Sequence, residues 1–233
     1  MPLISVVIPT LNEEKYILNV FNGLKEQSFK DFEVIVADKE STDKTRQIAK
    51  RNGAKVVVTS KAGISAGRNA GAKIARGKIL VFIDADTRPS KDLLKIYSKA
   101  FGGSTIAATG PIFALEKTDK LTKLGYAFVS ELFVKLSIAF GKASIIGSNF
   151  AVKKSVFDKV RGFDENLITY EDYDLSRRIS RYGTIKFLEE ASVSASIRRV
   201  AAWGMGKYFT YHVGNMIRYK FFRKAKDDYG PIR

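Results

Sequence analysis

The first 86 residues alternate between short apolar runs and amphipathic stretches, and this alternation restricts the fold more than any other feature of the chain. Apolar runs rich in β-branched residues predict four strands, at residues 3–8, 32–37, 55–59 and 79–83. The segments between them space their apolar side chains as helices do. Strand–helix–strand units of this kind form a parallel sheet with helices on both faces. The sequence therefore predicts an α/β fold with a Rossmann-like, mostly parallel central sheet.

The pattern is less regular after Pro89. It predicts helices at residues 92–101, 119–140, 153–160 and 171–182, and strands at residues 105–113, 147–152 and 184–188. From residue 196 the chain is basic and aromatic, and it shows no strand pattern. We therefore expect one domain at residues 1–193, with halves at 1–90 and 91–193, followed by a helical extension at 194–233.

The composition limits the class of protein. A hydrophobic content of 45% is enough for a proper core, and the lack of cysteine excludes a disulfide scaffold, a zinc ribbon and thiol catalysis. The sequence shows no signal peptide and no apolar run long enough to span a membrane. We therefore expect a cytoplasmic protein, with peripheral binding to the cytoplasmic face of a membrane as an option. A net charge of +16 indicates an anionic partner: nucleic acid, anionic lipid or a phosphorylated substrate.

Two aspartates, Asp84 and Asp86, follow the fourth predicted strand and are separated by Ala85. Because side chains alternate along a strand, both are expected to point the same way at its carboxyl end. Open α/β sheets bind their ligands at that end. Two converging carboxylates repel each other unless a cation lies between them, and oxygen ligands suit Mg²⁺ or Mn²⁺. A solvated turn before Pro89 is the alternative, but the buried strand favours a metal site.

Polar clusters also follow the other predicted strands, and they should meet at one edge of the sheet. Their members are Pro9, Thr10, Asn12 and Glu13 after the first strand, Asp38 after the second, and Lys61, Gly63, Arg68 and Asn69 after the third. Asp38 is placed to accept a hydrogen bond from the imide of a base. The small residues of the third cluster let a helix N-terminus approach an anion. Each cluster could serve only as a helix cap or a surface charge, but together they indicate a nucleoside diphosphate with its metal.

A separate acidic cluster, Glu171-Asp172-Tyr173-Asp174, opens a predicted helix. The helix dipole favours acids at this position and explains at least one of them. Three acids in four residues exceed what capping requires. A carboxylate here could take a proton from an attacking hydroxyl group.

These motifs, in this order, resemble family 2 glycosyltransferases of the GT-A fold. The matching segments are residues 5–14, 36–45, 66–71, 82–87, Gly147-Ser148-Asn149-Phe150, Gly162-Phe163-Asp164-Glu165 and 171–175. The resemblance covers residues 3 to about 190, and it is the joint order of the motifs that is specific.

The resemblance implies transfer of a single sugar from a nucleoside-diphosphate sugar to a glycan or a lipid-linked acceptor, with inversion and with Mn²⁺ or Mg²⁺. Residues 1–90 would bind the donor, and residues 91–193 would bind the acceptor. Asp38 would read the base, Asp84 and Asp86 would hold the ribose and the metal–diphosphate, and Asp172 would be the general base. Asn149 and Glu171 would lie near the acceptor or a phosphate.

The chain departs from the family pattern in two places. Many family members carry two successive acids after the second strand, whereas Asp38 is followed by Lys39 here. The donor is therefore expected to be either a UDP-sugar or a GDP-sugar. The Gln-X-X-Arg-Trp motif of processive synthases is absent, which favours single-sugar transfer. Two alternatives remain: a polyprenyl-phosphate acceptor, which needs no base, and a non-catalytic module that binds nucleic acid or an anionic surface.

The extension at residues 194–233 holds nine basic and two acidic residues, interleaved with aromatic ones. This composition suits an anionic membrane interface. Packing of the aromatic side chains on the domain is an equally good interpretation. Arg198 and Arg199 could instead hold a diphosphate or a lipid phosphate. Nucleic acid is not an expected partner, because no nucleic-acid-binding motif accompanies the basic residues.

Overall fold

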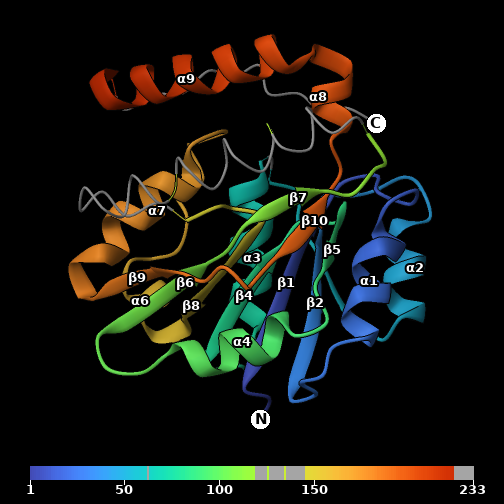
Figure 1. Ribbon diagram of the computed structural model, residues 1–233. Coiled ribbons are helices and arrows are strands. Elements are labelled where there is room, and N and C mark those ends of the chain that lie inside the picture. The colour runs from blue at the N-terminus through green and yellow to red at the C-terminus, as the bar shows by residue number, and fades with distance from the viewer. Residues whose placement is uncertain (62, 119–124, 126–133, 135–144, 223–233) are drawn as a thin grey trace.

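The computed structural model describes residues 1–61, 63–118, 125, 134 and 145–222, and it shows a central sheet flanked by helices (Figure 1). The sheet has seven strands in the order β3-β2-β1-β4-β8-β6-β9. These strands are β1 (Ile4–Thr10), β2 (Phe32–Asp38), β3 (Lys55–Val58), β4 (Ile79–Ile83), β6 (Thr105–Thr109), β8 (Asn149–Lys153) and β9 (Thr184–Phe187). β1 to β4 pair in parallel, as predicted, and β8 runs antiparallel between β4 and β6. The predicted α/β fold with a mostly parallel sheet is confirmed.

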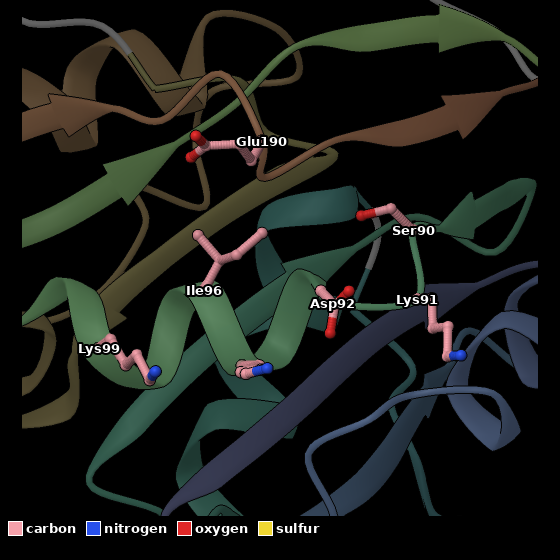
Figure 2. A pocket seen from close by; sticks show the side chains of 7 residues that line it. Ser90, Lys91, Asp92, Ile96, Lys99 and Glu190 are labelled. Carbon is pink, nitrogen blue, oxygen red and sulfur yellow. The ribbon is translucent and has the colours of Figure 1, made fainter.

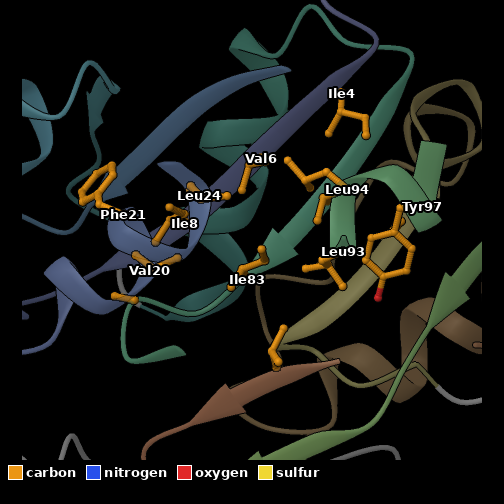
Figure 3. Close-up of a cluster of buried hydrophobic side chains, with 14 of the residues drawn as sticks. Ile4, Val6, Ile8, Val20, Phe21, Leu24, Ile83, Leu93, Leu94 and Tyr97 are labelled. Carbon is orange, nitrogen blue, oxygen red and sulfur yellow. The ribbon is translucent and has the colours of Figure 1, made fainter. Parts of the chain in front are cut away.

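The helices cover both faces of this sheet. They are α1 (Ile17–Lys25), α2 (Thr45–Arg51), α3 (Ile64–Ile74), α4 (Leu93–Ala100), α6 (Lys154–Lys159), α7 (Glu171–Ile179) with a 3₁₀ turn at Ser180–Tyr182, α8 (Arg198–Trp203) and α9 (Met205–Phe222). A hydrophobic core lies on each face of the sheet. Because successive side chains of a strand point to opposite faces, β1 contributes residues to both cores. Ile4, Val6 and Ile8 pack with α1 and α4 (Figure 3), whereas Val7 packs on the other face with α3.

The core on that other face is aromatic. The rings of Phe82 and Phe150, from the neighbouring strands β4 and β8, stack at 4.8 Å between centroids. Phe163 meets Phe82 edge to face at 5.4 Å. Such contacts stabilise a core by about 0.5–1.5 kcal/mol each beyond the burial of area. They fix the end of β4, which leads directly to the two aspartates.

A second, three-stranded sheet lies beside the first, in the order β5-β10-β7. Its strands are β5 (Thr87–Pro89), β7 (Ile112–Ala114) and β10 (Val193–Ala195). The sequence analysis missed β5 and β10, because three-residue strands leave no readable alternation. The predicted strand at 105–113 is in fact two strands, β6 and β7, that end and begin around Gly110. The expected boundary between residues 193 and 194 falls inside β10.

The third helix begins at Ile64, so Arg68 lies inside α3 and not at its N-terminus, where an anion was expected. The predicted helix at 119–140 lies outside the described residues, apart from residues 125 and 134.

The C-terminal extension packs against the domain through α9. The Tyr219 hydroxyl is buried and donates to Asp174 Oδ1 at 2.7 Å, and the Tyr170 hydroxyl donates to the His212 carbonyl at 2.8 Å. These contacts agree with the packing interpretation, and they join α9 to the helix that carries the acidic cluster. In the described part of the chain, no helix combines the length and the apolar character that crossing a membrane requires.

Glu33 makes the fold sensitive to acid. Burial acts to raise its pKa, but hydrogen bonds from Lys55, from the Arg76 amide and from Ser5 outweigh burial and lower the pKa from 4.5 to about 2. A lowered pKa stabilises the folded state above the unfolded-state pKa, and this contribution is lost as the pH falls towards the folded-state pKa. We expect urea unfolding to show a free energy of unfolding that falls less between about pH 5 and pH 2 in Glu33→Gln than in the wild type. Glu26→Gln, which removes an exposed carboxylate, should keep the wild-type slope.

Candidate active site

The predicted polar clusters do meet at one edge of the central sheet. Thr10 and Asp38, the last residues of the neighbouring strands β1 and β2, are directly paired in register. Asp84 and Asp86 follow β4, which is the other neighbour of β1. The carboxyl ends of three adjacent parallel strands thus bring these side chains together.

Asp38 itself is sealed from solvent. Its carboxylate accepts hydrogen bonds from the Ser41 amide at 2.8 Å, from the Ser41 hydroxyl at 2.6 Å and from the Thr10 hydroxyl at 2.9 Å. Arg46 Nε lies 3.5 Å from Oδ1. Asp38 therefore ties the end of β1 to the loop before α2, and the structure gives its carboxylate these partners where the sequence analysis expected a base.

Arg68 is the centre of a buried ion-pair network. Its side chain is 2% exposed, and it donates from Nη1 to Glu171 Oε1 at 2.8 Å and from Nη2 to Asp84 Oδ1 at 2.9 Å. The guanidinium also lies 5.3 Å from the centre of the Phe163 ring. This placement differs from the expected anion-binding loop: Arg68 links the acidic pair after β4 to the acidic cluster at α7.

Arg198, the first residue of α8, pairs with the second aspartate. Its guanidinium forms a bidentate ion pair with Glu13, in which Nη1 donates to Oε2 at 3.0 Å and Nη2 donates to Oε1 at 2.8 Å. Nη2 also lies 3.2 Å from Asp86 Oδ2. Burial and the neighbouring Asp84 raise the pKa of Asp86 to about 7, against the opposing effect of Arg198. The expected role of Glu13 at a nucleotide is thus replaced in the structure by a role as partner of Arg198.

The residues after β4 suit a divalent cation, although among the described residues no three acidic, histidine or cysteine side chains are arranged to hold one. The ion pairs use Oδ1 of Asp84 and Oδ2 of Asp86, so one oxygen of each carboxylate stays outside them. Four carboxylates, those of Glu13, Asp84, Asp86 and Glu171, pair with the two guanidinium groups of Arg68 and Arg198, which leaves an excess of negative charge. Two carboxylates that complete their site with phosphate oxygens of a substrate are a usual donor set for Mg²⁺.

Glu171 and Asp172 differ in accessibility, although they are adjacent in sequence. Glu171 is buried against Arg68, whereas Asp172 is half-buried. Asp172 Oδ2 accepts from the Gly147 amide at 3.0 Å, and Oδ1 accepts from the Tyr173 amide at 2.7 Å. Burial raises the pKa of Asp172, although Arg68 and the two amides act in the opposite direction. Asp172 is therefore the least buried acid of the cluster.

Asn149 has a different place from the expected one. It is fully buried, and its amide nitrogen donates to the carbonyls of Ala191 at 2.8 Å and Pro111 at 3.2 Å. Its Oδ1 accepts from the Tyr97 hydroxyl at 2.8 Å. With both ends of the amide engaged, Asn149 joins β8 to two loops and is not available to an acceptor or a phosphate.

The third predicted cluster holds a neighbouring loop. Asn69 donates to the Phe163 carbonyl at 2.9 Å and to Glu165 at 3.0 Å, and its Oδ1 accepts from the Phe163 amide at 2.9 Å. Lys61 pairs with Glu165 at 3.0 Å. Gly63 precedes α3 with a φ of 93°, a conformation that favours glycine. These residues position the segment before α7, and with it the acidic cluster.

The sequence analysis did not find several supporting residues. Tyr16 lies under Arg198, with its ring centre 4.5 Å from the guanidinium carbon. Glu116 accepts from the Ser196 hydroxyl and, at 2.9 Å, from the Ile197 amide, and so fixes the start of α8. Neither residue belongs to a motif, and only their positions in the fold connect them with the site.

Two hollows of the described surface lie away from these residues. One, of about 400 Å³, lies beside α4 and is lined by Ser90, Lys91, Asp92, Lys95, Ile96, Lys99 and Glu190 (Figure 2). Another, of about 620 Å³, is lined by residues at the amino end of β4 and by α6. Both are at the end of the sheet away from α8 (Figure 1). The candidate site is thus an open edge rather than one of these cavities.

A mostly parallel sheet with two aspartates after its fourth strand is the arrangement that the resemblance to GT-A glycosyltransferases implies. The model of the family described as "Glycosyl transferase family 2" matches residues 5–161, which is more than half of the chain. The protein belongs to glycosyl transferase family 2 and is therefore an enzyme of the glycosyltransferase class. The alternative of a non-catalytic binding module is overturned by this match.

Similar proteins are also glycosyltransferases. The amylovoran biosynthesis glycosyltransferase AmsB of Erwinia amylovora is 28% identical, over 94% of this chain and 75% of the relative. The poly(ribitol-phosphate) β-N-acetylglucosaminyltransferase TarS of Staphylococcus aureus is 38% identical, over 39% of this chain but only 17% of the relative. The chain thus spans three quarters of the first relative and a small part of the second.

Two solved structures share the fold. TarS residues 1–349 in complex with UDP match with a TM-score of 0.65 and 21% identity, over 94% of this chain and 72% of that one. A mannosyltransferase from Pyrobaculum calidifontis in complex with GDP-Man and Mn²⁺ matches with a TM-score of 0.67 and 19% identity, over 91% and 64%. At this level of identity the likeness concerns the fold alone.

Proposed function

We propose that the protein transfers a single sugar from a nucleoside-diphosphate sugar to an acceptor hydroxyl, with a divalent metal and with inversion at the anomeric carbon. The observation that carries the proposal is the pair Asp84 and Asp86 at the carboxyl end of β4, of which Asp84 is joined through Arg68 to Glu171, the neighbour of the half-buried Asp172. Solved structures of similar fold bind UDP, UDP-GlcNAc, and GDP-Man with Mn²⁺. These complexes support a UDP- or GDP-sugar as the donor.

Asp84 and Asp86 would hold the metal and, through it, the donor diphosphate. When bound, a divalent cation neutralises the negative charge that develops on the leaving diphosphate. Arg68 holds the Asp84 carboxylate in place, because its own guanidinium is fixed by Glu171. The base and ribose would lie over the ends of β1 and β2, where Asp38 shapes the loop that contains Asn12.

Asp172 would act as the general base. The acceptor oxygen forms a bond to the anomeric carbon while the bond from that carbon to the diphosphate breaks, and the hydroxyl proton passes to Asp172. Attack on the face opposite the leaving group inverts the anomeric configuration. A raised pKa suits this role, because a base works best with a pKa close to the working pH. Arg199 would border the acceptor, whereas Glu171 is taken up by its ion pair with Arg68.

A polyprenyl-phosphate acceptor is the alternative, and the basic extension is the observation that favours it. A phosphate nucleophile is already ionised and needs no base. The same extension could place the enzyme on an anionic membrane surface, from the cytoplasmic side.

The donor class can be tested by thermal unfolding with UDP, GDP, dTDP and CMP, each with Mn²⁺, Mg²⁺ or EDTA. A nucleotide at about 100 times its dissociation constant stabilises a protein by ~2.7 kcal/mol. We expect stabilisation by UDP or GDP that requires the metal and that is lost in Asp84→Asn/Asp86→Asn. Asp164→Asn, which removes an exposed carboxylate, is the matched control. If none of the nucleotides stabilises the wild type with either metal, the donor site is wrongly assigned.

A further inference from the structure

Arg198 pairs with one oxygen of Asp86, a carboxylate that the proposed donor site requires. Its guanidinium lies between Glu13 and Asp86 and over the ring of Tyr16. A guanidinium has five donors and no acceptor, and its planar fork fits phosphate as well as carboxylate. The pair with Asp86 is thus one of two arrangements that the same side chain can adopt.

The two arginines of the site differ in how firmly they are held. Arg68 is 2% exposed and pairs with carboxylates on both sides, so it stays with Asp84. The side chain of Arg198 is 20% exposed. Arg198 Nη2 lies 3.2 Å from Asp86 Oδ2, so a divalent cation bound to Asp86 would lie next to the positive charge of Arg198. Two like charges so close together repel each other. Binding of a metal to Asp86 and pairing of Asp86 with Arg198 therefore compete.

We propose that Asp86 exchanges Arg198 for the metal when the donor binds, and that the released guanidinium then binds the donor diphosphate. The inference rests on the proposed donor function and adds an exchange of partners at Asp86. Glu13 keeps the guanidinium close to the site during the exchange, because it holds both Nη atoms.

A small rotation of α8 with Arg198 would change the contact between Trp203 of α8 and Tyr211 of α9, whose ring centres are 5.2 Å apart. Gly204 joins the two helices with a φ of 78°. The contacts of Tyr170 and Tyr219 hold α9 to α7. The Ile197 amide, just before α8, donates to Glu116 at 2.9 Å, which limits the movement of α8 to a small rotation. Trp203, the last residue of α8 and the only tryptophan of the chain, would report the movement.

The first test compares metal binding with nucleotide binding in Arg198→Gln. Free Mn²⁺ is measured by electron paramagnetic resonance, and UDP and GDP are titrated calorimetrically with saturating Mn²⁺. We expect Mn²⁺ alone to bind roughly three- to tenfold more tightly in the variant, the size expected for removing a partly buried ion pair. The nucleotide with Mn²⁺ should bind more weakly by a similar factor. Damage to the fold would weaken the binding of Mn²⁺ and the binding of the nucleotide. Tighter binding of Mn²⁺ together with weaker binding of the nucleotide is therefore specific to the exchange.

Two further variants serve as controls. Arg88→Gln removes a cation two residues from Asp86 that pairs only with the exposed Glu26 in the described structure, and it should leave both affinities unchanged. Arg198→Lys keeps a cation beside Asp86 and should bind Mn²⁺ alone as the wild type does. Equal or weaker binding of Mn²⁺ alone by Arg198→Gln would overturn the exchange.

The second test follows Trp203 fluorescence in the wild type. UDP or GDP with Mn²⁺ should change the emission, whereas either nucleotide with EDTA should not, and Arg198→Gln should lose the response. If the calorimeter shows metal-dependent nucleotide binding but Trp203 does not respond, the movement of α8 is refuted and the donor site stands. If no nucleotide binds to the wild type, the proposed donor function fails first.

Discussion

Replacing Asp172 by asparagine should lower kcat by ~10²–10⁴, the range that general-base catalysis usually contributes. Asparagine keeps the size of the side chain and can still accept from the Gly147 amide, but it cannot take the acceptor proton. Nucleotide binding should therefore stay within about twofold of the wild type, since Asp172 lies on the acceptor side of Arg68. Steady-state kinetics with a donor identified by thermal unfolding, together with calorimetry, separates the two effects.

The same variant decides between the two acceptor classes. An acceptor phosphate is ionised at neutral pH and needs no base. Turnover of Asp172→Asn close to that of the wild type would therefore contradict the role of Asp172 as general base and indicate a phosphate nucleophile. Asp164→Asn, eight residues earlier, changes a carboxylate that caps its own loop through Asn166. It should leave kcat unchanged, and it controls for the loss of one negative charge near α7.

Replacing Arg68 by methionine should lower the free energy of unfolding by about 3–5 kcal/mol. Methionine fills much of the volume but leaves Asp84 and Glu171 without their shared cation, and an uncompensated buried charge is strongly destabilising. Urea unfolding at neutral pH measures the change. Glu171→Gln in the same chain should recover part of the loss, because it removes one of the two stranded charges.

The control for this experiment is Lys73→Met on the same helix. Lys73 is exposed, and surface substitutions of this kind usually change the free energy of unfolding by less than about 0.5 kcal/mol. A loss in Arg68→Met that is no larger than in Lys73→Met would show that the network contributes little to stability.

The donor half of the fold could be predicted from the sequence because its signals are local. β1 to β4 are continuous apolar runs, and the helices between them carry their own periodicity. β5 and β10 could not be found, because Thr87-Arg88-Pro89 becomes a strand by pairing with β10, and Val193-Ser194-Ala195 by pairing with β5 and β7. Their stability comes from contacts about a hundred residues apart, which no local pattern records.

The carboxylates of the site were predictable, but their partners were not. Asp84, Asp86 and Asp172 stand in motifs. Arg68 was placed in an anion-binding loop because small residues surround it, but those residues serve close packing. A Cβ at Gly71 would lie 2.4 Å from a methyl group of Val7, so α3 needs a glycine there to approach β1. The buried place of Arg68 follows from that approach.

The ion pairs that complete the site span most of the chain: Arg68 meets Glu171 across 103 positions, and Glu13 meets Arg198 across 185. Contacts this distant in sequence form late in folding, because the loop between them must close first. During synthesis the first four strands can pair as they leave the ribosome, since each neighbour follows within a few tens of residues. Glu13 and Asp86 cannot pair with Arg198 until α8 has been synthesised. In a nascent chain the sheet can therefore form well before the site is complete.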